Sequence, residues 1–209
     1  MSFLNSSCSF TRFHIIDEIP KDLWPKIPEL LKQFSFNDID SVPEMRSFGW
    51  VSFDDMYDST WEQTSPYKGN YIVFSLRLDT RRIPAGVIKK HLTLALREEK
   101  ERIAQQNKNF ISRERKKEIK EQVMLNLRQR FLPVPAEFNV LWNLDGNAIW
   151  LASTQNSVID LFIEHFRTTF ELNLETLSPL NLATSMLDEA GLARLDRLEE
   201  THFVPRPDA

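Results

Sequence analysis

The sequence predicts an α+β protein in which an antiparallel sheet is interrupted by two inserted helices. Three observations indicate this fold class. Alternating apolar segments typical of strands lie on both sides of residues 81–131, those residues have helical spacing instead, and they hold most of the positive charge. A strand, a helix and two strands precede the insertion, and two strands, a helix and a strand follow it. We therefore expect an antiparallel-sheet core built from two similar halves.

The segment before the insertion is predicted to supply three strands and one helix. Residues 10–16 and 48–53 have strand patterns, and residues 70–80 are the clearest strand of this half. Residues 20–34 have helical spacing, and the regular helix is expected to begin near Pro28, because proline fits the first helical turn. The polar residues 54–70 are predicted to form a surface loop.

The insertion is predicted to be a helical hairpin. Pro84 fits the first turn of a helix that continues to about Gln105. Residues 107–109 form a polar break, and Ser112 can cap a second helix that continues to about Phe131. Projection at about 100° per residue gives this second helix an apolar stripe with a basic face beside it and an acidic face beyond.

The segment after the insertion begins with a hairpin, residues 137–144 and 147–154, joined through Asp145-Gly146. Residues 157–170 form an amphipathic helix, and residues 172–180 supply a last strand. Trp142 and Trp150 are expected to pack as a cross-strand pair. His165 falls on the apolar stripe of the helix and is expected to be partly buried. The predicted domains are a discontinuous core (1–80 and 132–185), the insertion (81–131) and a helical, flexible tail (186–209).

Charge is divided unevenly along the chain. Residues 81–130 hold fifteen Lys/Arg and six Asp/Glu, whereas the remaining residues hold eleven and twenty-four. Such polarity favours binding of a polyanion, first of all a nucleic acid contacted through its phosphates without reading sequence. Two alternatives remain: a basic face that meets an acidic protein surface, or one that only solvates the helices. The candidate phosphate-binding residues are Lys89, Lys90, Arg97, Lys100, Arg113, Lys116, Lys117, Lys120 and Arg128.

The sequence gives little indication of catalysis or of a cofactor. Asp54, Asp55 and Asp58 lie in a turn-rich loop, the four histidines lack metal-ligand spacing, and Cys8 stands alone. We therefore expect no enzyme activity, no metal and no small-molecule substrate, with a metal-dependent nuclease as the less favoured alternative. Without a secretory signal or an apolar run of ~20 residues, a cytoplasmic protein that does not cross a membrane is expected.

Several segments, in this order, resemble the bacterial recombination-associated protein RdgC family over residues 9–190: "FTRFHII", "LLKQFSF", "GWVSF", "YIVFSLRLDTRRIPAGVIKKHL", "ISRERKKEIKEQV", "LRQRF", "NVLWNLDGNAIWLASTQ" and "LSPL". The resemblance implies a nucleoid-associated, non-enzymatic, sequence-independent DNA-binding protein. It also implies a ring-shaped homodimer that encircles DNA and contacts its partner through the tip of the insertion, near Leu127 and Phe131. Because family members continue into a further domain, a shortened member is expected, with a one-sided clamp or a tip-to-tip dimer as alternatives to a closed ring.

Overall fold

The computed structural model describes residues 3, 5–62, 64–105, 110–145 and 147–198. The predicted polar break at 107–109, Gly146 of the predicted turn and residues 199–209 of the predicted tail lie outside these ranges.

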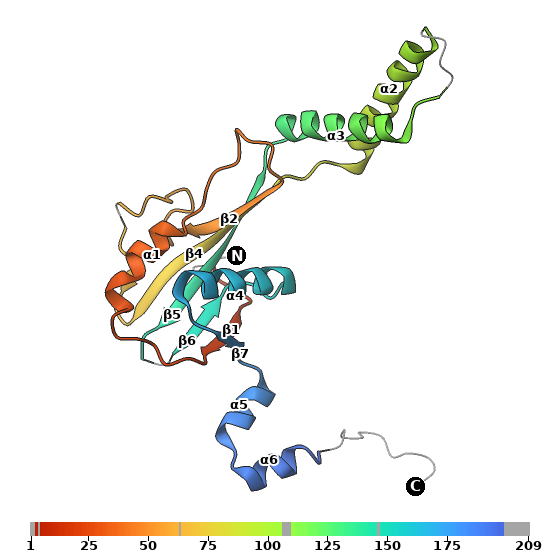
Figure 1. Cartoon of the computed structure of the whole chain (residues 1–209). Helices are drawn as coiled ribbons and strands as arrows, with labels where there is room; N and C mark the ends of the chain where they lie inside the picture. Colours follow the sequence, from red (N-terminus) through yellow and green to blue (C-terminus); the bar gives the residue numbers. More distant parts are fainter. Residues whose placement is uncertain (1–2, 4, 63, 106–109, 146, 199–209) are drawn as a thin grey trace, which may run out of the picture.

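Seven strands form one sheet, and every neighbouring pair is antiparallel, so the predicted fold class is confirmed (Figure 1). The strand order is β2-β4-β5-β6-β1-β7, with the two-residue β3 beside β4. Strand β1 from the start of the chain lies between β6 and β7 from its end, and the similarity of the two halves stays a prediction. The strands are β1 Thr11–Ile15, β2 Arg46–Val51, β3 Tyr67–Lys68, β4 Tyr71–Thr80, β5 Val134–Asn143, β6 Ala148–Leu151 and β7 Leu174–Thr176.

Two helices cover one face of the sheet and bury the core. They are α1 (Ile27–Gln33), which follows a 3-10 turn at Trp24–Lys26, and α4 (Asn156–Phe170) (Figure 1). The apolar stripe of α4 brings Phe162, Phe166 and Phe170 onto the strands, and the Phe166 ring centroid lies 5.3 Å from that of Trp142. Packing of one helix stripe on the apolar face of a sheet is what the alternating sequence pattern predicts.

The predicted cross-strand tryptophan pair is wrong. In the β5–β6 register Trp142 pairs with Ile149, and Trp150 pairs with Leu141. Side chains alternate between the two faces of a sheet, so this offset of one residue places the two indoles on opposite faces. Trp142 is fully buried under the helices, whereas the Trp150 ring lies 6.0 Å from the Tyr71 ring on the other face.

A tight packing site joins β2 to the segment after α1. The Phe36 amide donates to the Trp50 carbonyl oxygen, and the Trp50 amide donates to the Phe34 carbonyl oxygen. A Cβ atom added at Gly49 would lie only 2.5 Å from backbone atoms of Phe36, so this contact requires glycine. The Trp50 indole in turn donates to Thr169 of α4 at 2.8 Å, which ties the sheet to its covering helix.

His165 is buried beside that site, as the sequence indicated. Its ring centroid lies 4.4 Å from that of Trp50, and its side chain is 9% exposed. Burial lowers the pKa of His165 to about 4, although a hydrogen bond with the Phe34 backbone opposes the shift. The imidazole is therefore neutral in the folded protein near neutral pH.

The end of the chain differs from the expectation of one long strand. Strand β7 has three residues, and helix α5 (Pro179–Met186) begins where the strand was expected to continue, with Ser178 accepting a hydrogen bond from the Asn181 amide. Helix α6 (Glu189–Leu195) follows, and both helices lie apart from the sheet in Figure 1. The predicted boundary between residues 185 and 186 thus falls inside α5.

Candidate nucleic-acid interface

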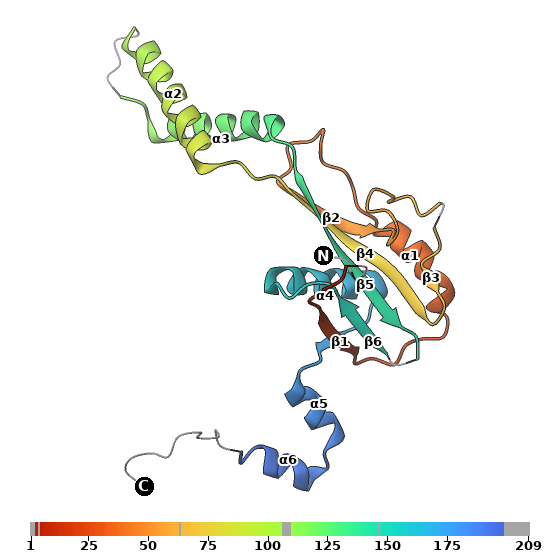
Figure 2. The same ribbon diagram turned by 180° about the vertical axis from the view of Figure 1, so that it is seen from behind.

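The inserted helices form an arm that projects from one end of the sheet (Figures 1 and 2). We use "arm" for residues 81–131 and "body" for the sheet with α1 and α4. The arm comprises α2 (Ala85–Ala104) and α3 (Arg113–Arg130), each close to its predicted bounds. Ser112 caps α3 as predicted, because its hydroxyl oxygen accepts from the Arg115 amide at 3.1 Å.

Few apolar residues hold the two helices of the arm together. Ile103 of α2 and Ile119 and Leu127 of α3 are the buried apolar side chains of these helices. Helix α3 has the predicted apolar stripe, but it is narrow. The arm therefore depends on a second type of contact, which local patterns in the sequence do not reveal.

That second contact is an ion-pair network centred on Glu99. The Glu99 carboxylate, 8% exposed, accepts from Arg115 of α3 at 2.9 Å and from Arg102 of its own helix at 2.8 Å. Arg115 also pairs with Glu118 at 2.8 Å. Hydrogen bonds from Arg115 and then Arg102 lower the pKa of Glu99, so its charge persists. Arg115 thus joins α3 to α2, and Arg102 supports Glu99 from within α2.

The nine candidate phosphate-binding residues are placed differently from those two arginines. Eight are exposed, and Arg128 is half-buried. Among the described residues, only Lys117 of the nine forms an ion pair, with Glu121 at 3.9 Å. The exposed eight are Lys89, Lys90, Arg97, Lys100, Arg113, Lys116, Lys117 and Lys120.

The contacts between α2 and α3 define two sides of the arm, and these sides show where the eight exposed residues lie. Glu99 meets Arg115, whereas His91 and Arg130 line one hollow, so the two helices run in opposite directions. Two adjoining hollows of about 350 and 230 Å³ follow one side of this contact, and both are lined by Glu98 and Asn126.

Helical projection then separates the charges of the arm. At about 100° per residue, the exposed basic residues of α2 point to the other side of the arm from the hollows, as do Arg113, Lys117 and Lys120 of α3. Lys116 lies at the edge of that side, beside the apolar stripe of α3. Glu98 lies on the side of the hollows, whereas Glu114, Glu118 and Glu121 lie on the outer face of α3, away from α2, where Glu121 pairs with Lys117. We call the side with the eight exposed lysines and arginines the basic side.

The two residues predicted at a tip contact lie near the base of the arm. Leu127 is 2% exposed between α2 and α3, and Phe131 is half-buried where the chain returns to the body. The free end of the arm carries Phe110, whose side chain is 81% exposed. A dimer contact at the tip stays a prediction, but in this chain Phe110 is the aromatic residue nearest to it.

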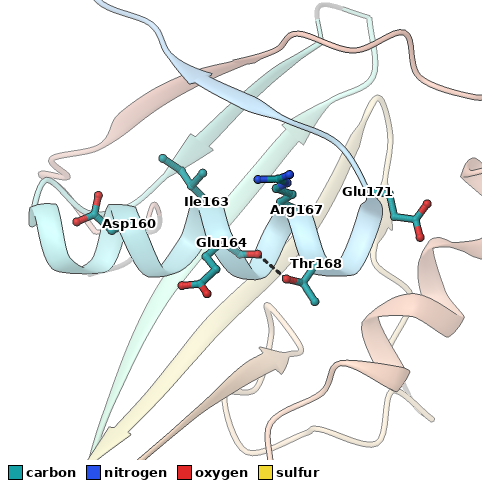
Figure 3. A pocket seen from close by; sticks show the side chains of 6 residues that line it. All are labelled: Asp160, Ile163, Glu164, Arg167, Thr168 and Glu171. Carbon is teal, nitrogen blue, oxygen red and sulfur yellow. Dashed lines mark hydrogen bonds between the residues drawn. The ribbon is translucent and has the colours of Figure 1, made fainter.

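A further hollow lies on the body, along the outer side of α4 (Figure 3). It measures about 610 Å³, and its lining includes the three carboxylates of Asp160, Glu164 and Glu171 and the single guanidinium of Arg167. The Thr168 hydroxyl donates to the Glu164 carbonyl oxygen of its own helix at 2.8 Å. This excess of negative charge disfavours a phosphate ligand here.

The acidic loop of the body is organised by its own carboxylates. Asp54 pairs with Lys68, and Asp58 accepts hydrogen bonds from Thr60, Trp61 and Thr64. In the part of the chain that the structure describes, no group of three or more His, Cys, Asp or Glu is arranged to hold a metal ion. Nor does any helix in that part have both the length and the apolar character needed to cross a membrane.

Comparison with known proteins agrees with the resemblance in the sequence. A search of curated proteins returned no match. A family model described as "RdgC: Putative exonuclease, RdgC" matches residues 15–189, a range that contains the arm, helices α1 and α4 and strands β2 to β7. The match extends over most of the 209 residues, and the chain therefore belongs to the RdgC family.

Proposed function

We propose that the chain is a sequence-independent DNA-binding protein that acts in recombination and contacts phosphates through the basic side of the arm. The observation that carries this proposal is the separation of charge on the arm. Exposed lysines and arginines from both helices share one side, and within the described residues seven of these eight form no ion pair. Membership of the RdgC family supports a role in recombination.

The chemistry of the basic side favours phosphates over bases. Lysine ammonium groups bind phosphate as point charges. A row of exposed lysines is not one of the side-chain patterns that read base edges. Affinity for DNA would come from release of counterions and fall steeply with salt. The acidic body, which carries most of the Asp and Glu residues, repels DNA and confines the contact to the arm.

A clamp built from two chains is the assembly that suits this geometry. In a homodimer joined at the free ends of the arms, near Phe110, two basic sides would face one duplex. An exposed phenylalanine is a suitable apolar anchor for such a contact. The proposed protein binds DNA without chemistry of its own; the family description favours an exonuclease as a second candidate.

Fluorescence anisotropy with two unrelated labelled duplexes and one single strand, each over a salt series, tests the proposal. We expect equal affinity for the two duplexes. In Lys100→Gln/Lys120→Gln, which removes one charge from each helix, the slope of log affinity against log salt should become shallower by about 2, because each lost phosphate contact removes ~0.9. The matched control is Lys21→Gln/Lys32→Gln, two exposed lysines of the body, which should leave the slope unchanged.

Two further measurements separate the alternatives. Incubation of end-labelled DNA with Mg²⁺ or Mn²⁺ reports on the nuclease, and progressive shortening of the strand would replace the binding-only proposal. Absence of DNA binding even at low salt, together with oligomers that dissociate as salt rises, would show that the basic side meets an acidic protein surface instead.

A further inference from the structure

One arginine of the arm is turned inward. Arg81 follows β4 directly, and its side chain is only 2% exposed. Its guanidinium donates to backbone carbonyl oxygens of Ile39 at 2.8 Å, Val42 at 2.9 Å, Glu44, and Phe131 at 2.5 Å. The first three carbonyls belong to the loop before β2 in the body, and the fourth belongs to the residue that ends the arm.

The surroundings of Arg81 differ from those of Arg77, the buried arginine of β4. Arg77 pairs with the Asp79 carboxylate at 2.8 Å and stacks over the Phe36 ring, with 4.1 Å between the guanidinium carbon and the ring centroid. Arg81, in contrast, forms no ion pair within the described part of the chain, and carbonyl dipoles alone solvate its charge. Burial of a charge without a counterion is costly unless its donors are satisfied, so the four hydrogen bonds are needed to keep Arg81 inside.

Arg81 lies where the arm joins the body, so its hydrogen bonds span this junction. The arm leaves the body after Thr80 and returns before Val134, and these two residues pair in the sheet. Helices α2 and α3 pack mainly on each other, and the arm projects beyond the body (Figures 1 and 2). The backbone of Arg81 lies in the outgoing connection, its side chain holds the returning connection at Phe131, and its amide donates to the Met45 carbonyl oxygen at 2.8 Å.

We propose that Arg81 is a positioning residue that fixes the direction of the arm relative to the body. Its planar guanidinium has five N–H donors in a rigid fork, so one side chain can hold the loop and the returning connection together. The consequence for DNA binding rests on the proposed function. Because the arm is held in one direction, the basic side stays in the orientation that binds DNA. Arg81 itself does not contact phosphate.

Distances between spin labels test the positioning role without DNA. In a Cys8→Ser background, one label at Glu114→Cys on the arm and one at Glu164→Cys on the body span the junction; both sites are exposed. We expect a narrow distance distribution in the wild type, a broader one in Arg81→Lys, and the broadest in Arg81→Gln. The control variant is Arg82→Gln, the exposed neighbour, which should keep the narrow distribution.

A second pair of labels, at Glu164→Cys and Lys32→Cys, lies wholly in the body and reports whether the variants fold. If the distance distribution of this body pair also broadens in Arg81→Gln, that variant does not fold correctly. The milder Arg81→Lys, which keeps the charge but loses the planar fork, then tests the positioning role. A distribution across the junction that stays as narrow as the wild type in a folded Arg81 variant would overturn the proposal.

DNA binding distinguishes failure of this inference from failure of the proposed function. If the orientation that binds DNA falls to about one tenth of the population, affinity falls about tenfold. The salt slope should stay unchanged, since the same phosphates are contacted. A shallower slope in Arg81→Gln, which removes the charge, would overturn the positioning role, because Arg81 would then be a phosphate contact. A broadened distribution with no DNA binding by any variant would support the positioning role and reject the proposed function.

Discussion

The body and the arm are stabilised in different ways. The body buries a continuous apolar core under α1 and α4, with Trp50, Phe74, Trp142 and Phe162 at 0% exposure. The arm buries three apolar side chains between its helices and relies on the Glu99 network as well. Large-to-small changes in the body should therefore reduce folding stability, whereas changes of charge on the arm should alter binding and leave the fold intact.

The largest expected effect is on the core of the body. Phe162→Ala should lower the free energy of unfolding by about 3–5 kcal/mol, because it removes a fully buried ring that contacts both Phe13 and Trp50. Urea denaturation followed by tryptophan fluorescence measures the loss. Leu94→Ala, at a 42% exposed position of the arm, is the matched control and should cost much less. Equal losses would contradict the distinction between body and arm.

Substitutions at two glycines, one in the body and one in the arm, test the same difference in packing. Gly49→Ala should lower the free energy of unfolding by ~1–3 kcal/mol, because the new methyl group meets Phe36 backbone atoms that cannot move independently. Gly86→Ala, in the first turn of α2, has nothing within 4 Å of the added Cβ and should be neutral or slightly stabilising. Thermal unfolding of both variants checks the difference, and a stable Gly49→Ala protein would show that β2 can shift away from residues 34–36.

Acidification should destabilise the body through His165. An unfolded histidine has a pKa near 6.5, and burial lowers the pKa of His165 to about 4, so between these values the unfolded state binds more protons. Stability therefore falls as the pH drops, by on the order of 2 kcal/mol from pH 7 to pH 5. His165→Phe should lose this part of the pH dependence, and His14→Gln, at an exposed position, should retain it. Parallel profiles for wild type and His165→Phe would assign the effect to other groups.

Loss of the Glu99 ion-pair network should have the smallest effect on the protein as a whole. Glu99→Gln should speed hydrogen exchange of amides in α2 and α3 while leaving exchange in β4 and β5 unchanged, because the network joins only the two helices of the arm. Glu98→Gln, a neighbouring exposed carboxylate that lines the hollow, is the control. Exchange that also accelerates in the strands would mean that arm and body unfold together.

Periodic patterns in the sequence located most elements, because the burial of one face imposes a spacing on each strand and helix. The start of α1, the Ser112 cap and the bounds of α2, α3 and α4 all follow from such local signals. The register of β5 and β6 does not follow from local signals, because a shift of one residue moves every side chain to the other face of the sheet. The predicted Trp142–Trp150 pair was wrong for this reason.

The candidate site was predictable in its exposed charges and unpredictable in its long-range contacts. Free lysines and paired arginines have similar patterns in the sequence, and only the fold brings Arg115 to Glu99. The same holds for Arg81, which counts as one more positive charge in the sequence although the fold surrounds it with carbonyl groups separated from it by 37 to 50 residues. One local signal could have pointed to the network: helical spacing places Glu99 on the apolar side of α2, where a carboxylate needs a partner.

The pairing of Thr80 with Val134 also bears on how the arm can vary. Strands β4 and β5 are matched over ten residue pairs, from Tyr71 and Asn143 to Thr80 and Val134, so the sheet register is complete before the chain enters the arm. The arm is topologically a very long hairpin loop. Its length, charge and tip can therefore be exchanged for those of another insertion, or shortened to a tight turn, while the ladder below keeps its pairing. Such a junction is a natural grafting point for building binding proteins with other arms on the same body.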